Sequence, residues 1–265
     1  MDDTPVNALE ASLAIKRLGA GLWSSVASPA YEAITGLFGG WTAALMLKSV
    51  LADPEAQGSP SAMTVNFISR VPPGSALLLR TALLGGGRSL THWRCDVLAD
   101  DELLATAVIV LANRKKSDFH TERTMPEAPA PASITPAILP GAFDTHIDVR
   151  PTLGDNIFNQ TTTRSLNWER EKSGRPMDAV QIAFLSDLGA PRIFFVSDGP
   201  RISSTITLSV YFLATSAELA SCGNDYILSE MIGTRAEAAT VASRKDMWSG
   251  DGRLLATTEQ LCWFR

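Results

Sequence analysis

Short runs of apolar and alternating residues fill much of both halves of the chain and predict two sets of β-strands. Turn formers such as Pro72-Pro73-Gly74 and Gly85-Gly86-Gly87 separate neighbouring runs. These connections are too short for a parallel crossover, so consecutive strands are expected to pair antiparallel. The predicted strands span residues 63–71, 76–84, 89–98, 103–112, 203–213, 226–234, 238–248 and 254–264.

One helix-like segment precedes these strands in each half. Residues 34–47 are apolar on nearly every side, which is the pattern of a helix enclosed by other structure. Residues 180–188 form a shorter apolar segment that also favours a helix. Each half is therefore predicted to hold one central helix and an antiparallel meander of strands.

A sequence repeat relates the two halves. Residues 100–114 align without gaps to residues 251–265, and six of the fifteen pairs are identical, where background composition would give roughly one. Between the halves, residues 125–132 are rich in Pro and Ala, a composition typical of a linker. We therefore predict an N-terminal domain over 1–120, a linker over 121–140 and a C-terminal domain over 141–265.

Composition argues against several classes of protein. The net charge of −5 disfavours a nucleic-acid partner, and the one basic run, 114–116, is interpreted as a solvated strand end. The three cysteines and three histidines are widely spaced, so neither a disulfide framework nor a metal site is predicted. The first residues lack a signal-peptide pattern, and the most apolar run, 103–112, is too short to cross a bilayer. We expect a cytoplasmic protein without membrane insertion.

Asp187 is a candidate general base because it ends the apolar run 182–186. A carboxylate that enters a buried segment must be hydrogen-bonded or protonated, and burial raises its pKa towards that of a useful base. The alternative is that Asp187 lies at a solvent-facing helix end. The residue pattern alone leaves both interpretations open.

Two further positions carry polar groups whose direction the pattern leaves open. Strict alternation along residues 203–213 would place Thr205 on one face with Ser203, Thr207, Ser209 and Tyr211, and that face could line a pocket or meet solvent. Gln260 occupies the position that Ile109 has in the repeat. If the two halves fold alike, the amide points into the interior; otherwise the two positions face differently.

Five short motifs, in one order along nearly the whole chain from about Gly39 onwards, resemble the double-hotdog acyl-CoA thioesterases of the thioesterase II type. They are Phe38-Gly39-Gly40, Gly87-Arg88-Ser89, Leu185-Ser186-Asp187, Ser204-Thr205-Ile206 and the segment from Asp251-Gly252 to Thr258-Glu259-Gln260. The resemblance implies an α+β fold of two tandem hotdogs, in which antiparallel sheets wrap around central helices. It also implies a homo-oligomer, and the charged fraction of 19% agrees with extra buried surface.

The resemblance further implies a catalytic set. In this family an Asp, a Thr and a Gln hold and activate the water that attacks the thioester carbonyl, and the matching residues are Asp187, Thr205 and Gln260. The segment after Thr205 lacks the Asp-His pair often found there. No metal and no organic cofactor is implied.

Substrate contacts are expected at Gly39, Gly40 and Trp41, where Trp41 stands in place of the smaller or polar residue common in the family. The first half has Ile109 at the Gln position and no acid within 36–47, so it is expected to be a non-catalytic partner of the second half.

The expected function is hydrolysis of an acyl-CoA to free acid and CoA. One alternative is a non-catalytic acyl- or lipid-binding protein of the same fold. A second is an acyl-CoA hydratase or dehydratase, which is disfavoured because such enzymes usually pair an Asp with a His and no His lies near Asp187 in the sequence.

Overall fold

Each half of the chain folds into a set of long strands and one central helix. The computed structural model describes residues 7–154 and 156–265; residues 1–6, where the predicted first domain begins, lie outside them. The first half contains α1 (Ala8–Ser12), β1 (Lys16–Gly19), β2 (Leu22–Val26), the 3-10 helix η1 (Pro29–Tyr31), β3 (Glu32–Ala33), β4 (Gly36–Leu37), α2 (Gly39–Leu51), β5 (Ser59–Phe67), β6 (Ala76–Gly86), β7 (Leu90–Ala99) and β8 (Glu102–Ala112). The second half contains the 3-10 helices η2 (Pro131–Ser133) and η3 (Ala142–His146), then β9 (Ile147–Leu153), β10 (Ser165–Glu171), α3 (Ala179–Ser186), α4 (Arg192–Phe195), β11 (Ser203–Phe212), α5 (Ser216–Ser221), β12 (Ile227–Glu237), β13 (Thr240–Trp248) and β14 (Leu254–Phe264).

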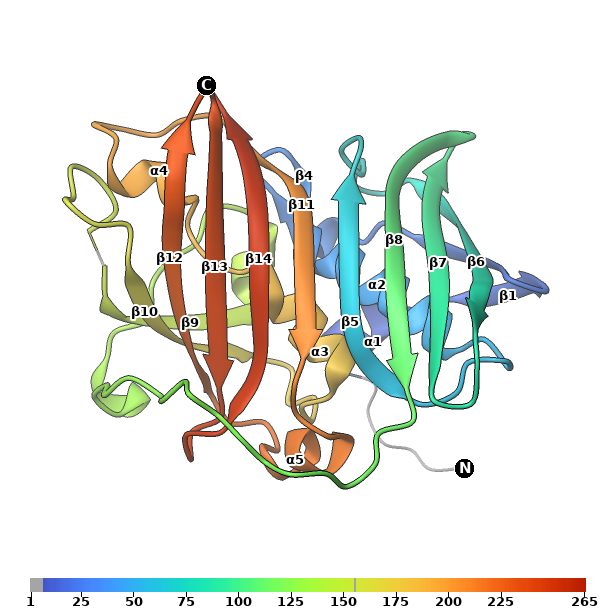
Figure 1. Ribbon diagram of the computed structural model, residues 1–265. Helices are drawn as coiled ribbons and strands as arrows, with labels where there is room; N and C mark the ends of the chain where they lie inside the picture. The colour runs from blue at the N-terminus through green and yellow to red at the C-terminus, as the bar shows by residue number, and fades with distance from the viewer. Residues whose placement is uncertain (1–6, 155) are drawn as a thin grey trace.

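The two sets of strands join into one continuous antiparallel sheet (Figure 1). Its order is β1-β2-β6-β7-β8-β5-β11-β14-β13-β12-β10-β9, and the halves meet where β5 pairs with β11. Read inward from either edge, each half contributes its strands in the same order, as expected for two copies of one fold. The predicted double hotdog is therefore confirmed.

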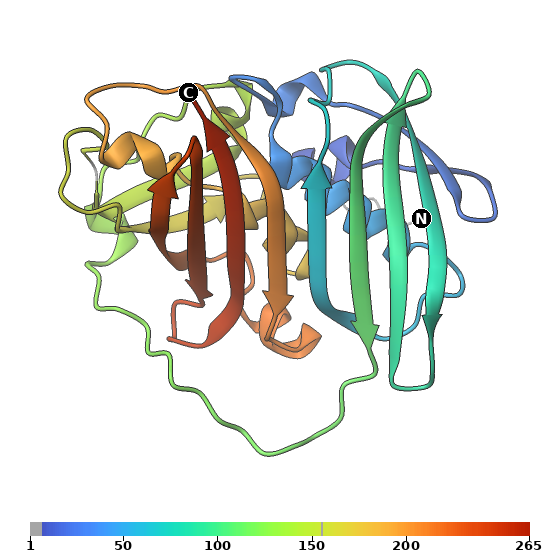
Figure 2. The ribbon, with the colours of Figure 1, turned by 45° about the horizontal axis from the view of Figure 1, so that its top comes forward.

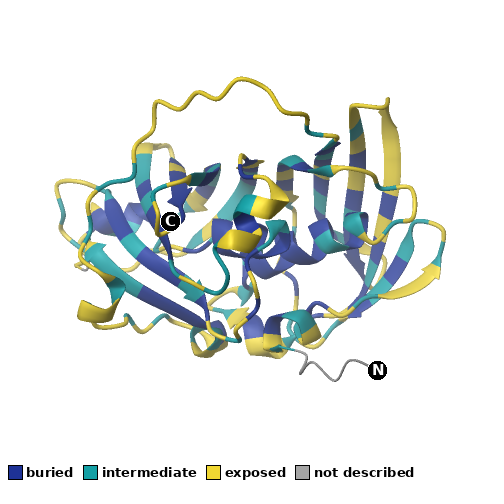
Figure 3. Ribbon diagram, turned by 90° about the horizontal axis from the view of Figure 1, so that it is seen from below, coloured by how far each residue is buried: buried dark blue, intermediate teal, exposed yellow. Residues whose placement is uncertain are grey.

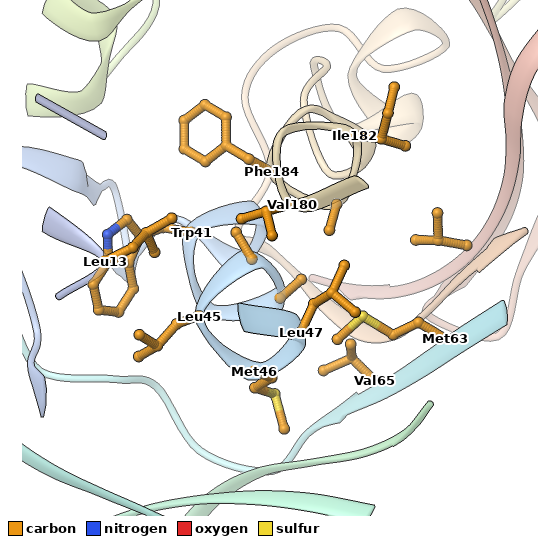
Figure 4. Close-up of a cluster of buried hydrophobic side chains, with 14 of the residues drawn as sticks. Leu13, Trp41, Leu45, Met46, Leu47, Met63, Val65, Val180, Ile182 and Phe184 are labelled. Carbon is orange, nitrogen blue, oxygen red and sulfur yellow. The ribbon is translucent and has the colours of Figure 1, made fainter. Parts of the chain in front are cut away.

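The two central helices pack against each other on the inner side of the sheet (Figure 4). Ten of the thirteen residues of α2 and seven of the eight residues of α3 are buried, which agrees with their apolar sequences. A Cβ on Gly40 would lie 2.1 Å from the carbonyl oxygen of Phe184, so only glycine permits this approach of the helices. Around them, Met63 and Val65 of β5 join the same buried cluster.

The first central helix begins later than the sequence pattern predicts. Residues 34–35 form the turn between β3 and β4 and residues 36–37 form β4, so none of them is helical; Gly36 has a φ of +138°, which a right-handed helix cannot contain. The predicted strand over 63–71 ends at Phe67. The edge pairs β1–β2 and β9–β10 and the short helices α4 and α5 were not predicted, because their sequences lack a clear apolar period.

The Pro/Ala-rich connection between the halves loops away from the sheet and then returns to it (Figure 2). Much of the loop is exposed (Figure 3). Its later part is attached to the second half: Trp168 Nε1 donates to the carbonyl oxygen of Pro129 at 2.8 Å, and Met125, Ala128 and Ile134 pack against the cluster that contains Trp168. The linker is thus partly docked rather than free.

Arg114 does not lie in solvent as predicted for the basic run. Its guanidinium donates to the carbonyl oxygens of Pro60 at 2.7 Å, Leu213 at 2.9 Å and Ala214 at 3.0 Å, and also to that of Phe212. These carbonyls belong to β5 of one half and to the end of β11 and the residues after it in the other. Arg114 therefore ties the two halves together at their junction, whereas Lys115 and Lys116 are exposed.

None of the helices in the described part of the chain is both long and apolar enough to cross a membrane.

Candidate active site

Three polar side chains from different elements converge at the end of α3. Asp187 is the residue that caps the carboxyl end of this helix, with φ −90° and ψ −1°. Gln260 Nε2 donates to Asp187 Oδ1 at 2.6 Å and to Thr205 Oγ1 at 2.7 Å, and Thr205 Oγ1 lies 3.3 Å from Asp187 Oδ1. The structure thus brings together all three residues that the family resemblance places in the catalytic set.

A β-bulge in β11 decides the direction of Thr205. Thr205 lies opposite Cys262 of β14 and Thr207 lies opposite Leu261, so Ile206 is an extra residue without a partner. The bulge moves Thr205 to the inner face, which it shares with Leu208. The prediction that Thr205 lies on one face with Thr207, Ser209 and Tyr211 is therefore wrong, because strict alternation stops at a bulge.

The repeat correctly indicates where Gln260 points. Gln260 lies opposite Leu208, and its repeat partner Ile109 lies opposite Met63 of β5, so both face the interior. Strand β5 has a register shift at the same place as β11, with Pro60 in the position that corresponds to Thr205. The first half therefore holds apolar side chains where the second half holds the amide and the hydroxyl.

The amino end of α2, from the first half, closes one side of the site. A Cβ on Gly39 would lie 2.5 Å from Asp187 Oδ2, and the backbone N–H of Gly40 donates to the Asp187 carboxylate. The positive end of a helix dipole lies at this terminus, so it favours a negative charge. The site therefore lies between the two halves and needs both of them.

Trp41 takes a different direction from its two glycine neighbours. It is fully buried, and its indole N–H donates to Ser12 Oγ at 3.0 Å. In Figure 4 its ring lies beside Leu13 of the N-terminal segment. The structure thus brings Gly39 and Gly40 to Asp187 and places Trp41 in the core.

Burial makes the Asp187 carboxyl a weaker acid than usual. The residue keeps partial exposure, but protein surrounds its carboxylate, and this desolvation raises its pKa to about 6. The hydrogen bond from Thr205, the positive charge of Lys245 and the donors Gly40 and Gln260 oppose the rise. A base with a pKa near 6 is ionised at neutral pH and still binds a proton readily.

The neighbouring thiol is unsuited to nucleophilic chemistry. Cys262 Sγ lies 3.8 Å from Thr205 Oγ1. Burial, and next the negative charge of Asp187, raise the pKa of Cys262 to about 12. The thiol therefore stays protonated and serves as a small apolar group.

Two buried charged residues beside the site escaped the sequence analysis. Lys245 of β13 and Glu169 of β10 are each 1% exposed, and Lys245 Nζ donates to Glu169 Oε2 at 2.8 Å. The sequence does contain a signal for Lys245. It lies at an even spacing from Val241 and Met247 in the same strand, so all three side chains are on one face, and those of Val241 and Met247 are buried. Among the described residues, no group of three or more His, Cys, Asp or Glu side chains is arranged so that it could hold a metal ion.

Comparison with known proteins assigns the family. Residues 27–112 match the family model of the acyl-CoA thioesterase N-terminal domain, and residues 120–264 match that of the acyl-CoA thioesterase C-terminal domain. The chain belongs to the acyl-CoA thioesterase family. The resemblance seen in the motifs is confirmed.

Solved structures similar to this acyl-CoA thioesterase family member share its fold over nearly the full length. A hot dog protein of unknown function from Alicyclobacillus acidocaldarius has 30% identity and a TM-score of 0.93, and the match covers 97% of this chain and 98% of that one. The tesB protein of Mycobacterium avium subspecies paratuberculosis has 19% identity and a TM-score of 0.79, with 97% and 98% covered. An acyl-CoA thioesterase II from Mycobacterium marinum has 16% identity and a TM-score of 0.79, with 97% of each chain covered. No curated protein matched the sequence.

Proposed function

We propose that this protein hydrolyses the thioester bond of an acyl-CoA, with Asp187 as the general base. The observation that carries the proposal is the convergence of Asp187, Thr205 and Gln260 at the amino end of α2. Base-assisted attack by water requires a carboxylate whose pKa is near neutrality and which amide and hydroxyl groups hold in a fixed position. Membership of the acyl-CoA thioesterase family supports acyl-CoA as the substrate.

In this proposal Gln260 orients the attacking water. Its Nε2 group uses both hydrogens on Asp187 and Thr205, and its amide oxygen has no protein partner in the described part of the chain. A water bound between that oxygen and the Asp187 carboxylate would donate one hydrogen to each. Thr205 holds the amide in this orientation, because its hydroxyl accepts from Gln260 and donates to Asp187.

The reaction then runs in two steps. Asp187 takes a proton from the water while the water oxygen forms a bond to the thioester carbonyl carbon. In this scheme the backbone N–H of Gly39 and the positive end of the α2 dipole stabilise the resulting oxyanion, because the N–H groups of Trp41 and Thr42 donate to the carbonyl oxygen of Phe38. The tetrahedral intermediate collapses, the carbon–sulfur bond breaks, and the proton passes from Asp187 to the departing CoA sulfur. The acid and CoA leave, and Asp187 is again a carboxylate.

The division of labour between the halves follows from the same side chains. The first half supplies the amino end of α2 but has Ile109 and Pro60 at the positions of Gln260 and Thr205. We therefore assign one site to each chain, with its catalytic side chains in the second half.

The test is thiol release from a panel of acyl-CoAs of different chain length. The protein should release CoA from at least one of them, and the Asp187→Asn variant should lose at least about a hundredfold in kcat/KM, as expected when a general base is removed. Asp96→Asn is the matched control, because Asp96 pairs with Arg94 on β7 and is far from the site in the sheet order. This variant should keep full activity.

Other outcomes would contradict the proposal. Tight binding of acyl-CoA without release of thiol from any chain length would indicate a binding protein of the same fold. Addition of water to an enoyl-CoA, without thioester cleavage, would indicate a hydratase. Equal activity in the Asp187→Asn variant and the native protein would remove Asp187 from the mechanism.

A further inference from the structure

Lys245 holds the turn on which Asp187 lies. Its Nζ donates to the carbonyl oxygens of Leu185 and Leu188, each at 2.8 Å, and to Glu169 Oε2 at 2.8 Å. Leu185 and Leu188 are two residues before and one residue after Asp187 in the sequence. The three donors of the ammonium group are thus all used, and two of them bind the backbone that carries the proposed base.

The position of Lys245 on the sheet places its charge on the inner face next to the site. Ser243 of β13 lies opposite Gln260, and Lys245 is two residues further along the same strand and face. The carbonyls that it binds are at the carboxyl end of α3, where the helix dipole is negative and a cation is favoured. Lys245 therefore joins the end of α3 to the strand beside Gln260.

Glu169 keeps Lys245 in place and balances its charge. Glu169 is 1% exposed, and its Oε2 also accepts a hydrogen bond from Ser229 Oγ at 2.8 Å. Taking two charges out of water is costly, and apolar side chains of the same size would commonly be at least as stable. An ion pair maintained at this cost beside a reactive carboxylate calls for a role other than stability.

The charged and titratable groups that face this region come from four other elements. Besides Lys245 on β13 they are Glu169 on β10, Asp187 at the end of α3, Arg192 on α4 and Cys262 on β14. Burial lowers the pKa of Arg192 only to about 10, so it remains a cation, and Cys262 remains a neutral thiol. The charge of Lys245 lowers the pKa of Asp187 and opposes the effect of burial.

Resting on the proposed hydrolysis, we propose that Lys245, braced by Glu169, is a positioning residue: it fixes the turn that carries Asp187 and supplies the positive charge that faces its carboxylate. The site then combines a buried base with a fixed counter-charge that is itself out of contact with solvent. Lys245 does not touch the substrate in this scheme and acts through Asp187.

The test compares pH profiles of kcat/KM for the native protein and three variants. The native acid limb should fall near pH 6, the pKa of Asp187. The double variant Lys245→Met with Glu169→Met removes the ion pair while keeping side chains of similar length, which favours folding. Its acid limb should move up by about one pH unit, with about a fivefold loss of kcat/KM at pH 6 and a loss approaching tenfold at lower pH.

Two further variants distinguish the effect of the Lys245 charge from the effect of its hydrogen bonds and from a general loss of protein stability. Lys245→Arg keeps the charge but cannot reproduce three bonds from one ammonium group, so its acid limb should stay near that of the native protein while the plateau falls. Arg114→Met removes another carbonyl-bound cation, at the far end of β11, and should lower the melting temperature without moving the limb.

The outcomes distinguish this inference from the proposed function. A native protein that hydrolyses no acyl-CoA would refute the function. An active native protein whose folded double variant keeps the same acid limb would refute the role of Lys245, as would a Lys245→Arg limb displaced as far as that of the double variant. Titration of ¹³C-labelled aspartate by NMR, with Asp187→Asn to assign the signal, measures the same shift without relying on turnover.

Discussion

Replacing Gly39 by alanine tests whether close contact between the two halves is needed for the site. The added Cβ would lie 2.5 Å from Asp187 Oδ2, 3.3 Å from Asp187 Cγ and 3.3 Å from Phe67 Cζ. Gly39 is the first residue of α2 and does not have a positive φ, so alanine fits the backbone there. The main effect of the substitution should therefore come from the collision with the carboxylate, because the 3.3 Å contact with Phe67 Cζ is only slightly shorter than an ordinary contact.

The structure sets the size of this effect. Ordinary contact begins at about 3.4 Å, so the carboxylate oxygen must move by about 0.9 Å. A movement of this size is large enough to break the hydrogen bond between Gln260 Nε2 and Asp187 Oδ1, which is 2.6 Å long. A misplacement of about 1 Å in a catalytic group costs on the order of a hundredfold in rate, or about 2.7 kcal/mol in the activation barrier.

Stability should change little in the Gly39→Ala variant. Alanine favours a helix over glycine by up to about 1 kcal/mol, which offsets part of the strain. The assay is kcat/KM from thiol release at pH 8, together with the melting temperature. Gly87→Ala is the matched control, since a Cβ there meets no atom within 4 Å and the φ of Gly87 is ordinary.

Two results would refute this reasoning. The first is a Gly39→Ala variant that retains activity within threefold of the native protein, which would mean that the site tolerates displacement of the carboxylate. The second is an equal loss of activity in Gly87→Ala, which would mean that the effect does not depend on the contact with Asp187.

Three further predictions follow from the same contacts. The kcat/KM profile should rise through an apparent pKa of about 6 to a plateau, because only the carboxylate form of Asp187 takes a proton from water; a limb near pH 4 would contradict this. Because the pKa of Asp187 is raised from 3.8 to about 6, the contribution of this residue to stability is fully present below pH 3.8 and is lost as the pH rises through 6. Asp187→Asn should therefore increase the free energy of unfolding at pH 8, measured with urea, by up to about 3 kcal/mol. Arg114→Met should lower that free energy by about 2 kcal/mol, because it leaves the carbonyls that join β5 to β11 without their donor, and an unchanged urea midpoint would show that the junction does not need it.

Much of the fold could be predicted from local patterns. The apolar sequences of α2 and α3 require enclosure on all sides, and the short turns between the long strands require antiparallel pairing. These features depend on neighbouring residues, so they can be recognised in the sequence. The edge strands and the start of α2 were missed because their patterns are weak or interrupted, as at Gly36.

The candidate site could likewise be predicted only in part from the sequence. The comparison with the apolar Ile109 gave Gln260 an inward direction on the condition that the two halves fold alike, and Asp187 stands out at the end of an apolar run. The direction of Thr205 could not be predicted, because Ile206 forms a bulge only through the register that β11 adopts against β14. Strand register is decided by the partner strand, which is distant in the sequence.

The sequence by itself determined two copies of one fold and their central helices, and its resemblance to the family pointed to Asp187, Thr205 and Gln260 as the candidate site. Only the tertiary structure decided that Gly39 of one half would meet Asp187 of the other, and that Lys245 would bind the turn beneath it. The physical reason is the range of the forces involved. Periodicity and helix ends are set by neighbours along the chain, whereas bulges, close approaches and buried charges depend on packing between residues far apart in sequence.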